Sequence, residues 1–378
     1  MKQVRDGRTK VIRLVPELDF GGVESGIVVQ AGLIDRDRFD FRVCTFWKDG
    51  ASAAEIRKQG IPVDVLGADP SIYKPSATLA LAGYLRRMRP DVLHASITEA
   101  DFHAALLAPF RWARRTTIDE AGFPEIARWR RRVVFRGLNR LVDDVIVVSQ
   151  RLGEFLARHE GAPRRKIRFI PNCGSPRFFT DRKHDYRVQG ARFRLGVVGR
   201  LVEVKNHATL IEALALIDEP ARPEIWLFGE GPLKARLLAQ AERLGVSEQV
   251  KLQGYKPGWI GDTLKSLDGF AQPSFAEGCS LALIEAMALG LPVLTSKADG
   301  NLEVMGPLAS GWTIDAGDAA GWATALRQLA ARSPDERRSH GDVALQRAHA
   351  RYSPQAYVAA LDALYEGRGA DTTGRCSP

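Results

Sequence analysis

The sequence predicts an α/β protein made of two doubly wound domains, each built on a parallel sheet. Short apolar runs rich in β-branched residues alternate with longer amphipathic stretches along the 378 residues, which is typical of parallel strands joined by helices. A polar, aperiodic stretch near residues 180–192 interrupts this alternation. Hydrophobic and charged residues make up 45% and 26% of the chain. These values are ordinary for a globular protein and exclude a disordered or collagen-like chain.

The element pattern predicts where each domain begins and ends. The first domain is expected over residues 1–180, the linker over 181–192 and the second domain over 193–352. A last helix is expected over 353–367, and 368–378 is expected to form a flexible tail. The expected strands are 11–15, 41–46, 63–66, 91–96, 115–118, 144–149 and 166–171, then 193–199, 224–229, 250–254, 269–273 and 292–296. In such sheets ligands bind at the carboxyl ends of the strands.

The cysteines and the apolar runs indicate the compartment. The four cysteines (Cys44, Cys173, Cys279 and Cys376) are widely separated and have neither metal-ligand nor CxxC spacing. We therefore predict no zinc site and no disulfide framework, which suits a reducing cytosol. We also expect no signal peptide and no transmembrane helix, because the apolar runs are too short or interrupted.

Positive charge is concentrated in one stretch. The chain has 54 Lys and Arg against 45 Asp and Glu, a net charge of +9. Residues 111–180 hold 16 basic and 7 acidic side chains, so this stretch carries the whole excess. Such asymmetry indicates an anionic partner, which could be nucleic acid, a membrane surface or a phosphorylated substrate.

Within this stretch, residues 125–141 predict a basic amphipathic helix. Its arginines are Arg128, Arg131, Arg132, Arg136 and Arg140, and its apolar stripe is Ile126, Trp129, Val133, Gly137 and Leu141. Two interpretations remain open: a core-facing stripe below a solvated basic face, or a helix that docks on anionic lipid. We expect no nucleic-acid partner, because no recognised motif or aromatic interleaving accompanies the charge.

The chemistry-bearing pattern of the second domain lies in residues 274–293. Glu277, Gly278 and Cys279 follow a predicted strand, and Ser280 is a good residue to begin the next helix. Free backbone amides at that helix end favour an anion, and glycine lets the backbone approach a phosphate closely. Glu285 lies eight residues after Glu277 in an apolar helix, where a buried carboxylate needs partners. Both carboxylates could accept hydrogen bonds from the hydroxyls of a sugar.

A second pattern lies in GVVGRLVEVKN, residues 196–206. Gly199 ends a predicted strand, and Arg200 and Lys205 come before the next helix. Two cations at such a turn suit a diphosphate, although two solvated surface charges would look the same. Gly229 lies in FGEGP at another strand end, and this segment is not a GxGxxG dinucleotide fingerprint.

Together these motifs resemble the retaining glycosyltransferases of family 4 (glycosyl transferases group 1). The resemblance covers the chain and rests on Glu277 and Glu285 at their Glu-x7-Glu spacing, with the supporting segments GRLVEVKN (199–206), FGEGP (228–232), ADGNLEV (298–304), FGGVE (20–24), DVIVVSQRLGEFL (144–156) and IRFIPN (167–172). It implies the GT-B fold, in which two Rossmann-like domains face a central cleft and the last helix, here 353–367, crosses back onto the first domain. It also implies a nucleotide-sugar donor as substrate, with no metal or other cofactor.

The resemblance further implies roles for the matching residues. Lys205 and Arg200 would hold the diphosphate and stabilise its charge as it leaves. Glu277 would contact the donor sugar near its reacting carbon, and Glu285 would bind the ribose. The remaining implied donor-binding residues are Gly21, Gly22, Gly199, Gly229, Gly278, Cys279 and Ser280. The acceptor would be a glycan or lipid-linked hydroxyl in cell-surface polysaccharide or glycolipid biosynthesis, at the cytoplasmic face of the membrane.

The sequence departs from the family pattern in the first domain. Asp119 and Glu120 stand where family members commonly have a histidine, and His94 matches the first of two strand histidines while Ser96 replaces the second. These three residues, His94, Asp119 and Glu120, could contact the acceptor or the donor sugar. A buried structural histidine and solvated loop carboxylates are the competing interpretations.

Other functions remain open at this point. A GT-B sugar-nucleotide epimerase would use the same donor without an acceptor, and a relative without catalysis would bind the donor only. A metal-dependent GT-A enzyme would need an Asp-x-Asp motif, and the triplet Asp35-Arg36-Asp37 has this residue pattern. That triplet follows a predicted helix rather than a strand, so we interpret it as a surface turn.

Overall fold

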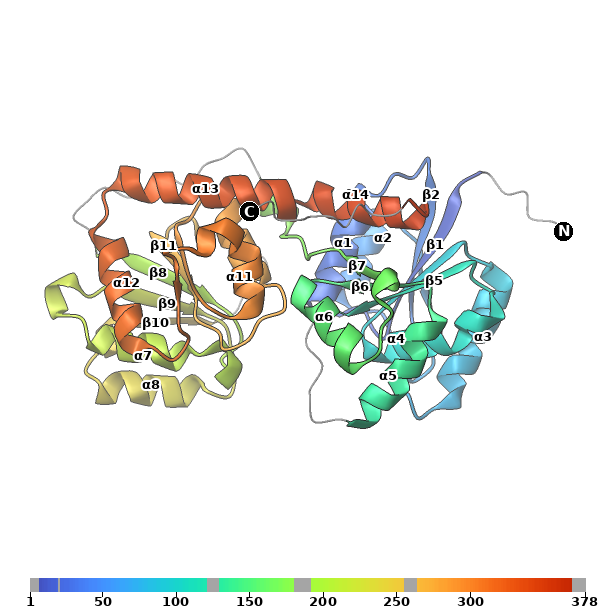
Figure 1. Cartoon of the computed structure of the whole chain (residues 1–378), viewed down its shortest axis with the longest axis horizontal. Coiled ribbons are helices and arrows are strands. Elements are labelled where there is room, and N and C mark those ends of the chain that lie inside the picture. The colour runs from blue at the N-terminus through green and yellow to red at the C-terminus, as the bar shows by residue number, and fades with distance from the viewer. Residues whose placement is uncertain (1–6, 20, 121–128, 180–191, 255–263, 369–378) are drawn as a thin grey trace. The chain divides into compact units, whose positions relative to one another are not determined.

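The protein forms two compact units (Figure 1). The computed structural model describes residues 7–19, 21–120, 129–179, 192–254 and 264–368. Unit 1 comprises residues 1–172 together with 354–378, and unit 2 comprises residues 173–353. None of the helices in these described ranges has the length and hydrophobicity needed to span a lipid bilayer.

Unit 1 contains a seven-stranded parallel sheet in the order β3-β2-β1-β4-β5-β6-β7. Its strands are β1 (Thr9–Val15), β2 (Phe39–Thr45), β3 (Val63–Val65), β4 (Val92–Ser96), β5 (Arg115–Glu120), β6 (Asp144–Val147) and β7 (Ile167–Phe169). The strand order reverses between β1 and β4, where Arg13 pairs in register with His94. Ligands of open α/β sheets bind beyond the carboxyl ends of the strands at such a reversal.

Helices cover both faces of this sheet. They are α1 (Gly22–Leu33), α2 (Ala51–Lys58), α3 (Pro75–Met88), α4 (Thr98–Leu107), α5 (Trp129–Leu141), α6 (Gln150–His159) and α14 (Pro354–Tyr365). Apolar side chains of α1, α2 and α14 share one core with β1 and β2. On the other face α4 packs against β1, β4 and β5 and contacts both α3 and α5. The last helix of the chain is therefore an integral part of unit 1.

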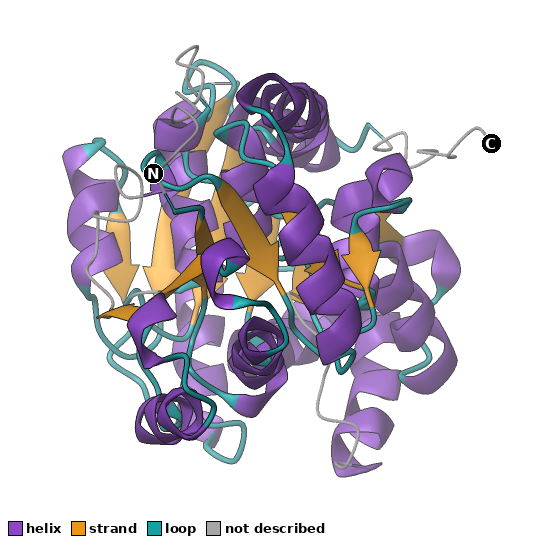
Figure 2. Cartoon of the chain, turned by 90° about the vertical axis from the view of Figure 1, so that its left-hand side faces the viewer, coloured by secondary structure: helices purple, strands orange, loops and turns teal. Residues whose placement is uncertain are grey.

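Unit 2 repeats the plan with a six-stranded parallel sheet in the order β10-β9-β8-β11-β12-β13. Its strands are β8 (Arg194–Val198), β9 (Glu224–Phe228), β10 (Val250–Gly254), β11 (Gly269–Gln272), β12 (Val293–Ser296) and β13 (Thr313–Ile314). Its helices are α7 (His207–Ala215), α8 (Lys234–Arg243), α10 (Leu281–Ala288), α11 (Asp299–Met305), α12 (Ala319–Ala331) and α13 (Pro334–Tyr352). Figure 2 shows these strands as a layer between helices.

Two separate cores hold the helices of unit 2 on opposite faces of the sheet. Side chains of α7, α8 and α12 pack with β8 and β9, and those of α10, α11 and α13 pack with β11 and β12. The strand order reverses between β8 and β11. The predicted fold class of two doubly wound parallel-sheet domains is confirmed, and Asp35-Arg36-Asp37 lies in the turn between α1 and β2.

The predicted apolar stripe of α5 does not face the core. Val133 is 64% exposed and Leu141 is 42% exposed, whereas Phe135 and Leu138 are buried. The described apolar residues that face inward are Phe135 and Leu138, whose burial removes apolar surface from water. The residues Ile126 and Arg128 and the side chains of Trp129 and Arg131 lie outside the part that the structure describes.

Candidate functional site

The main candidate site lies in unit 2, where β8 and β11 end side by side. After β8 the chain passes Gly199 and Arg200 and makes a short 3₁₀ turn over Glu203–Lys205. Asn206 follows in the left-handed conformation, with φ of 54°. Asparagine tolerates this conformation better than most residues. The side-chain amide of Asn206 donates to the Pro273 carbonyl, 3.1 Å away, and so ties this loop to the loop that follows β11.

Glu277 is the centre of a hydrogen-bond network at this point. Lys205 Nζ lies 2.6 Å from Glu277 Oε1, the Gln272 amide donates to the same oxygen at 2.8 Å, and the Ser274 hydroxyl donates at 2.7 Å. The Glu277 side chain is only 9% exposed. A buried carboxylate is stable only when it is paired and hydrogen-bonded. Every hydrogen bond to this carboxylate from the described residues reaches Oε1, which leaves Oε2 available to a ligand.

Two glycines allow the backbone around this network to pack closely. A side chain at Gly229 would overlap the carbonyl oxygen of Gly199, so the ends of β8 and β9 can approach only without one. A side chain at Gly300 would overlap the carbonyl oxygens of Glu277 and Gly278, and the Gly300 amide donates to the Glu277 carbonyl at 3.1 Å. The segment 298–304 therefore holds the Glu277 loop in place through its backbone.

The N-terminus of α10 lies beside this loop. The Ser280 hydroxyl accepts from the Leu283 amide, 3.4 Å away, and begins the helix as predicted. Gly278 and Cys279 are partly exposed just before it. Their amides and the positive end of the helix can face an anion in this position.

Glu285 makes its hydrogen bond on a different loop. Its Oε1 accepts from the Ser175 amide at 3.3 Å. Burial raises the pKa of Glu285 from its usual value of 4.5 to about 7, opposed by the Ser175 hydrogen bond and by the charge of Arg177. The structure thus brings Lys205 and Glu277 into contact, while Arg200 is exposed and makes no ion pair with other described residues.

Three residues of this site were not anticipated from the sequence. Gln272 and Ser274 hold Glu277, and Ser175 holds Glu285. The signal available in the sequence was QPS, residues 272–274, which begins on the last residue of β11, because polar side chains that end a parallel strand lie at the ligand-binding edge. Ser175 gave no such signal, since it lies about a hundred residues away from its partner.

In unit 1 the glycines of FGGVE lie at the beginning of α1. Gly21 precedes the helix, and Gly21 and Gly22 are both exposed. The carboxylate of Glu24 lies directly against Gly21. Burial raises the pKa of Glu24. The Glu24 carboxylate accepts a hydrogen bond from its own backbone amide, so a carboxylate already lies at this helix end, and the contact of Gly21 and Gly22 with a donor phosphate stays a prediction.

The structure joins His94 and Asp119 through a third residue, Arg13 of β1. Arg13 Nη2 lies 3.2 Å from Asp119 Oδ2, and Arg13 Nη1 contacts the His94 ring. His94 Nε2 lies 3.8 Å from Asp119 Oδ2. Burial, followed by the charge of Arg13, lowers the pKa of His94 to about 4, so the ring is neutral near pH 7. Glu120 is partly buried at the end of β5.

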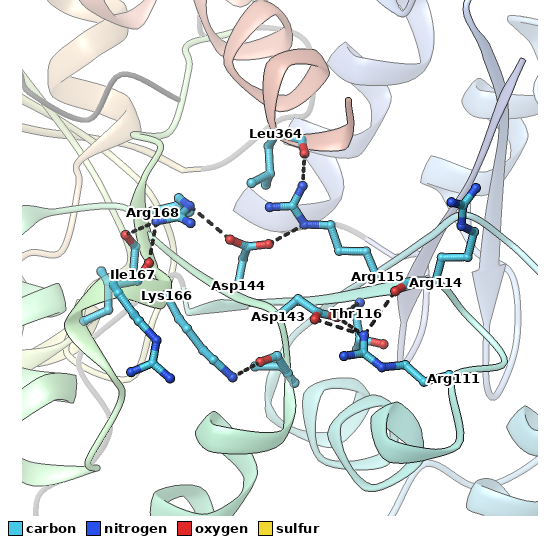
Figure 3. Close-up of polar contacts among 12 residues, drawn as sticks. Arg111, Arg114, Arg115, Thr116, Asp143, Asp144, Lys166, Ile167, Arg168 and Leu364 are labelled. Carbon is cyan, nitrogen blue, oxygen red and sulfur yellow. Dashed lines mark hydrogen bonds and ion pairs between the residues drawn. The ribbon is translucent and has the colours of Figure 1, made fainter. Parts of the chain in front are cut away.

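Several cations of the basic stretch have partners inside unit 1 (Figure 3). Asp144 is buried and pairs with two arginines, Arg115 at 2.6 Å and Arg168 at 3.0 Å. Asp143 pairs with Arg111 at 3.0 Å, and Lys166 Nζ donates to the Arg140 carbonyl at 2.8 Å. These cations serve the fold. Among the described side chains of α5, Arg136 and Arg140 are exposed to solvent.

Comparisons with known proteins identify relatives of both domains. Residues 20–174 match the model of "Glycosyltransferase Family 4", and residues 180–343 match that of "Glycosyl transferases group 1". The lipopolysaccharide core biosynthesis glycosyltransferase LpsE of Rhizobium meliloti is 35% identical over 137 residues, which are 35% of this chain and 38% of LpsE. The amylovoran biosynthesis glycosyltransferase AmsK of Erwinia amylovora is 31% identical over 201 residues, 51% of this chain and 49% of AmsK. The chain thus spans half or less of the length of these curated relatives.

Solved structures share the fold over nearly the whole chain. HepE of Anabaena in complex with UDP superposes with a TM-score of 0.80 at 20% identity, covering 95% of this chain and 100% of HepE. The same protein has also been solved with UDP-glucose, with a TM-score of 0.77. This likeness establishes that the two doubly wound units have the fold seen in HepE.

Proposed function

Because the chain belongs to the glycosyltransferases, with a family 4 first domain and a group 1 second domain, we propose that it transfers a sugar from a nucleotide-diphosphate sugar to an acceptor hydroxyl. The acceptor is a glycan or a lipid-linked glycan in cell-surface polysaccharide or lipopolysaccharide biosynthesis, the role named for LpsE and AmsK. The observation that carries this proposal is the contact between Lys205 and Glu277 at the strand reversal of unit 2.

Departure of the nucleoside diphosphate builds negative charge on the leaving oxygen. Lys205 is held in place by Glu277, and Arg200 is exposed on the same loop. Fixed cations and the amides before α10 stabilise such charge without reorganising during the reaction. HepE, which shares this fold, was solved with UDP, and this supports a nucleoside diphosphate as a ligand.

The two glutamates then divide the recognition of the donor. Glu277 keeps Oε1 on its protein partners and offers Oε2 to a hydroxyl of the donor sugar. Glu285, partly buried on α10, accepts from the ribose hydroxyls, which replace part of the hydration that its burial removes. An ionised carboxylate accepts hydrogen bonds without donating. Because the pKa of Glu285 is about 7, this role requires the deprotonated form, which predominates above pH 7.

We propose retention of the anomeric configuration, with the acceptor attacking from the face that the diphosphate leaves. In this reaction the bond from the acceptor oxygen to the anomeric carbon forms as the bond to the diphosphate oxygen breaks. The acceptor proton passes to the departing phosphate. The route needs no nucleophile from the enzyme. It also needs no resident cofactor, because Lys205 and Arg200 supply the positive charge, so chelation of metals with EDTA should leave the rate unchanged.

We further propose that α5 places the enzyme on the cytoplasmic membrane surface. Its outer face combines exposed Val133, Val134 and Leu141 with exposed Arg136 and Arg140. Apolar residues flanked by arginines suit an anionic lipid surface, where each cation contributes about 1 kcal/mol. A lipid-linked acceptor would be reached from this position.

The proposal is tested by binding and transfer experiments on the intact chain. UDP- and GDP-sugars are screened by calorimetry, and the donors that bind are then incubated with membrane lipid extracts. Transfer of labelled sugar to a lipid-linked product, with retained configuration, is the expected result. Epimerised sugar formed from the donor alone, without transfer, would overturn the proposal.

A further inference from the structure

The site in unit 2 has a counterpart in unit 1 at Asp119, and the sequence motifs, which indicated Asp119, did not indicate its partner Arg13. In unit 2, a lysine and a serine hydroxyl bind one oxygen of Glu277. In unit 1, Arg13 Nη2 and the Ser96 hydroxyl bind one oxygen of Asp119, at 3.2 and 3.1 Å. Both carboxylates lie beside the point where the strand order of their sheet reverses.

The register of the sheet explains this arrangement. Arg13 pairs with His94, and Ser96 pairs with Asp119 on the next strand. The Asp119 carboxylate therefore lies two residues beyond Arg13 in the direction of the carboxyl edge. The guanidinium of Arg13 extends toward the carboxyl edge of the sheet, and the Asp119 carboxylate lies at that edge. Arg13 itself is fully buried, and a buried guanidinium needs a carboxylate to balance its charge.

The free oxygen of Asp119 is the functional part of this arrangement. All hydrogen bonds that the described residues give to this side chain end on Oδ2. The side chain keeps 11% of its surface exposed. Oδ1 therefore faces outward and can accept a hydrogen bond from a ligand.

The remaining neighbours fix the ring and the guanidinium from the other side. The Tyr365 hydroxyl accepts from Gln30 at 2.9 Å and lies 2.8 Å from His94 Nδ1. The Tyr365 hydroxyl directs its own proton to His94 Nδ1. The neutral His94 ring therefore carries its hydrogen on Nε2, on the Asp119 side. Tyr357, also on α14, adds to the electrostatic environment of Arg13.

We propose that Arg13 is a positioning residue: by binding Oδ2 it fixes the Asp119 carboxylate as an anion whose Oδ1 accepts a hydroxyl of the sugar substrate. This inference rests on the proposed glycosyl transfer and adds a hydroxyl-accepting group from unit 1. It excludes Asp119 as a group that gains and loses a proton during turnover. Burial alone would raise the pKa of this carboxyl, but His94 and Arg13 outweigh burial and hold it below its usual range.

The test compares kcat/KM between pH 5 and 9 for the wild type, Arg13→Met and Asp119→Asn. We expect no Asp119 ionisation in the wild-type profile. Asp119→Asn should lower kcat/KM roughly tenfold to a hundredfold, as expected for loss of a hydrogen bond to a charged group. In Arg13→Met the buried carboxylate loses its cation, so a new acid limb should enter the profile between pH 5 and 7.

Two further variants keep the test decisive if Arg13→Met unfolds. Arg13→Lys keeps the charge and should show no acid limb. Arg13→Met/Asp119→Asn removes both charges and should lose no more kcat/KM than Asp119→Asn alone. The matched control is Arg115→Met, which removes a cation from buried Asp144 in the same sheet. It should lower thermal stability without adding an acid limb.

Failure of this inference can be told apart from failure of the proposed function. Unchanged kcat/KM in Asp119→Asn, or a wild-type pH profile in Arg13→Met, would overturn the role of Arg13 while transfer itself persists. UDP affinity should be unchanged in Asp119→Asn, because the proposed ligand of Oδ1 is a sugar hydroxyl. Absence of wild-type transfer with every donor that binds would overturn the proposed function and this inference with it.

Discussion

Glu277 receives three donors on a single oxygen, and of these Lys205 carries the charge. Replacing Lys205 with alanine removes the cation that we propose stabilises the leaving diphosphate. We expect Lys205→Ala to lower kcat/KM by about a hundredfold to a thousandfold, the usual loss for one preorganised transition-state donor. Steady-state transfer assays measure this effect.

The matched control for this variant is Lys234→Ala. Lys234 pairs with Glu230 on the exposed surface of α8, at 3.3 Å. An exposed pair of this kind contributes little to stability. The control should retain full activity and the wild-type melting temperature. Equal activity in both variants would contradict the assignment of Lys205 to the site.

Glu285 makes the stability of unit 2 depend on pH. Its folded pKa of about 7 lies above the usual value of 4.5. The folded state thus binds more protons than the unfolded state between these values, so the free energy of unfolding falls as pH rises from 4.5 to 7. The loss is at most about 3 kcal/mol. Urea unfolding should show this slope in the wild type and a flatter one in Glu285→Gln.

Glu242→Gln on α8 is the control for this measurement, since Glu242 is exposed. It should follow the wild type at every pH. Identical slopes for the wild type and Glu285→Gln would show that the buried carboxyl does not carry the pH dependence.

Sequence motifs identified the charged members of the site but not their partners. Lys205, Glu277 and Glu285 are spaced in recognisable segments. Arg13 had no such signal, because an arginine inside an apolar strand reads as an interruption of the pattern. The role of Arg13 depends on Asp119, 106 residues further along the chain. A pair of residues so far apart in the sequence can be recognised only in the folded sheet.

Helix α5 shows that periodicity can predict a helix without saying which of its faces is buried. The stripe containing Val133 and Leu141 has helical spacing, yet both residues are exposed. If this face binds membrane, replacing both residues with aspartate should weaken binding to anionic vesicles by tenfold or more, because it removes apolar contact and adds repulsion. Sedimentation with phosphatidylglycerol vesicles measures the affinity.

A control for this variant is Leu79→Asp, since Leu79 is 70% exposed on α3. It should bind vesicles as the wild type does. Equal binding by the α5 variant and the wild type would contradict the membrane-facing role of this helix.

At the scale of the whole chain, net charge locates a basic stretch but does not say which of its cations are available to a partner. Asp143 and Asp144 lie within residues 111–180 and pair with Arg111, Arg115 and Arg168. The stretch still has 16 basic against 7 acidic side chains, so its anionic partner stays a prediction. The alternation of strands and helices was a better guide, because parallel sheets require both and the twofold repetition is visible in the sequence. The fold class followed from it, whereas the internal ion pairs did not.

The Asp144 pairs should therefore be worth more to stability than surface pairs. Asp144→Asn leaves Arg115 and Arg168 without their shared anion, and we expect the free energy of unfolding to fall by about 3 kcal/mol. Asp335→Asn, which breaks the exposed pair with Arg338, should change it by less than about 0.5 kcal/mol. Urea denaturation compares the two, and similar losses would mean that Asp144 acts as a surface charge.

The assignment of α14 to unit 1 sets the order in which the protein can be completed during synthesis. Leu361, Leu364 and Tyr365 belong to the core of unit 1, although unit 2 lies before them in the chain. A nascent chain emerging from the ribosome exposes that apolar face until all of unit 2 has been translated. Unit 2 is continuous in sequence and can therefore fold first, whereas the core of unit 1 is complete only after α14 has been translated.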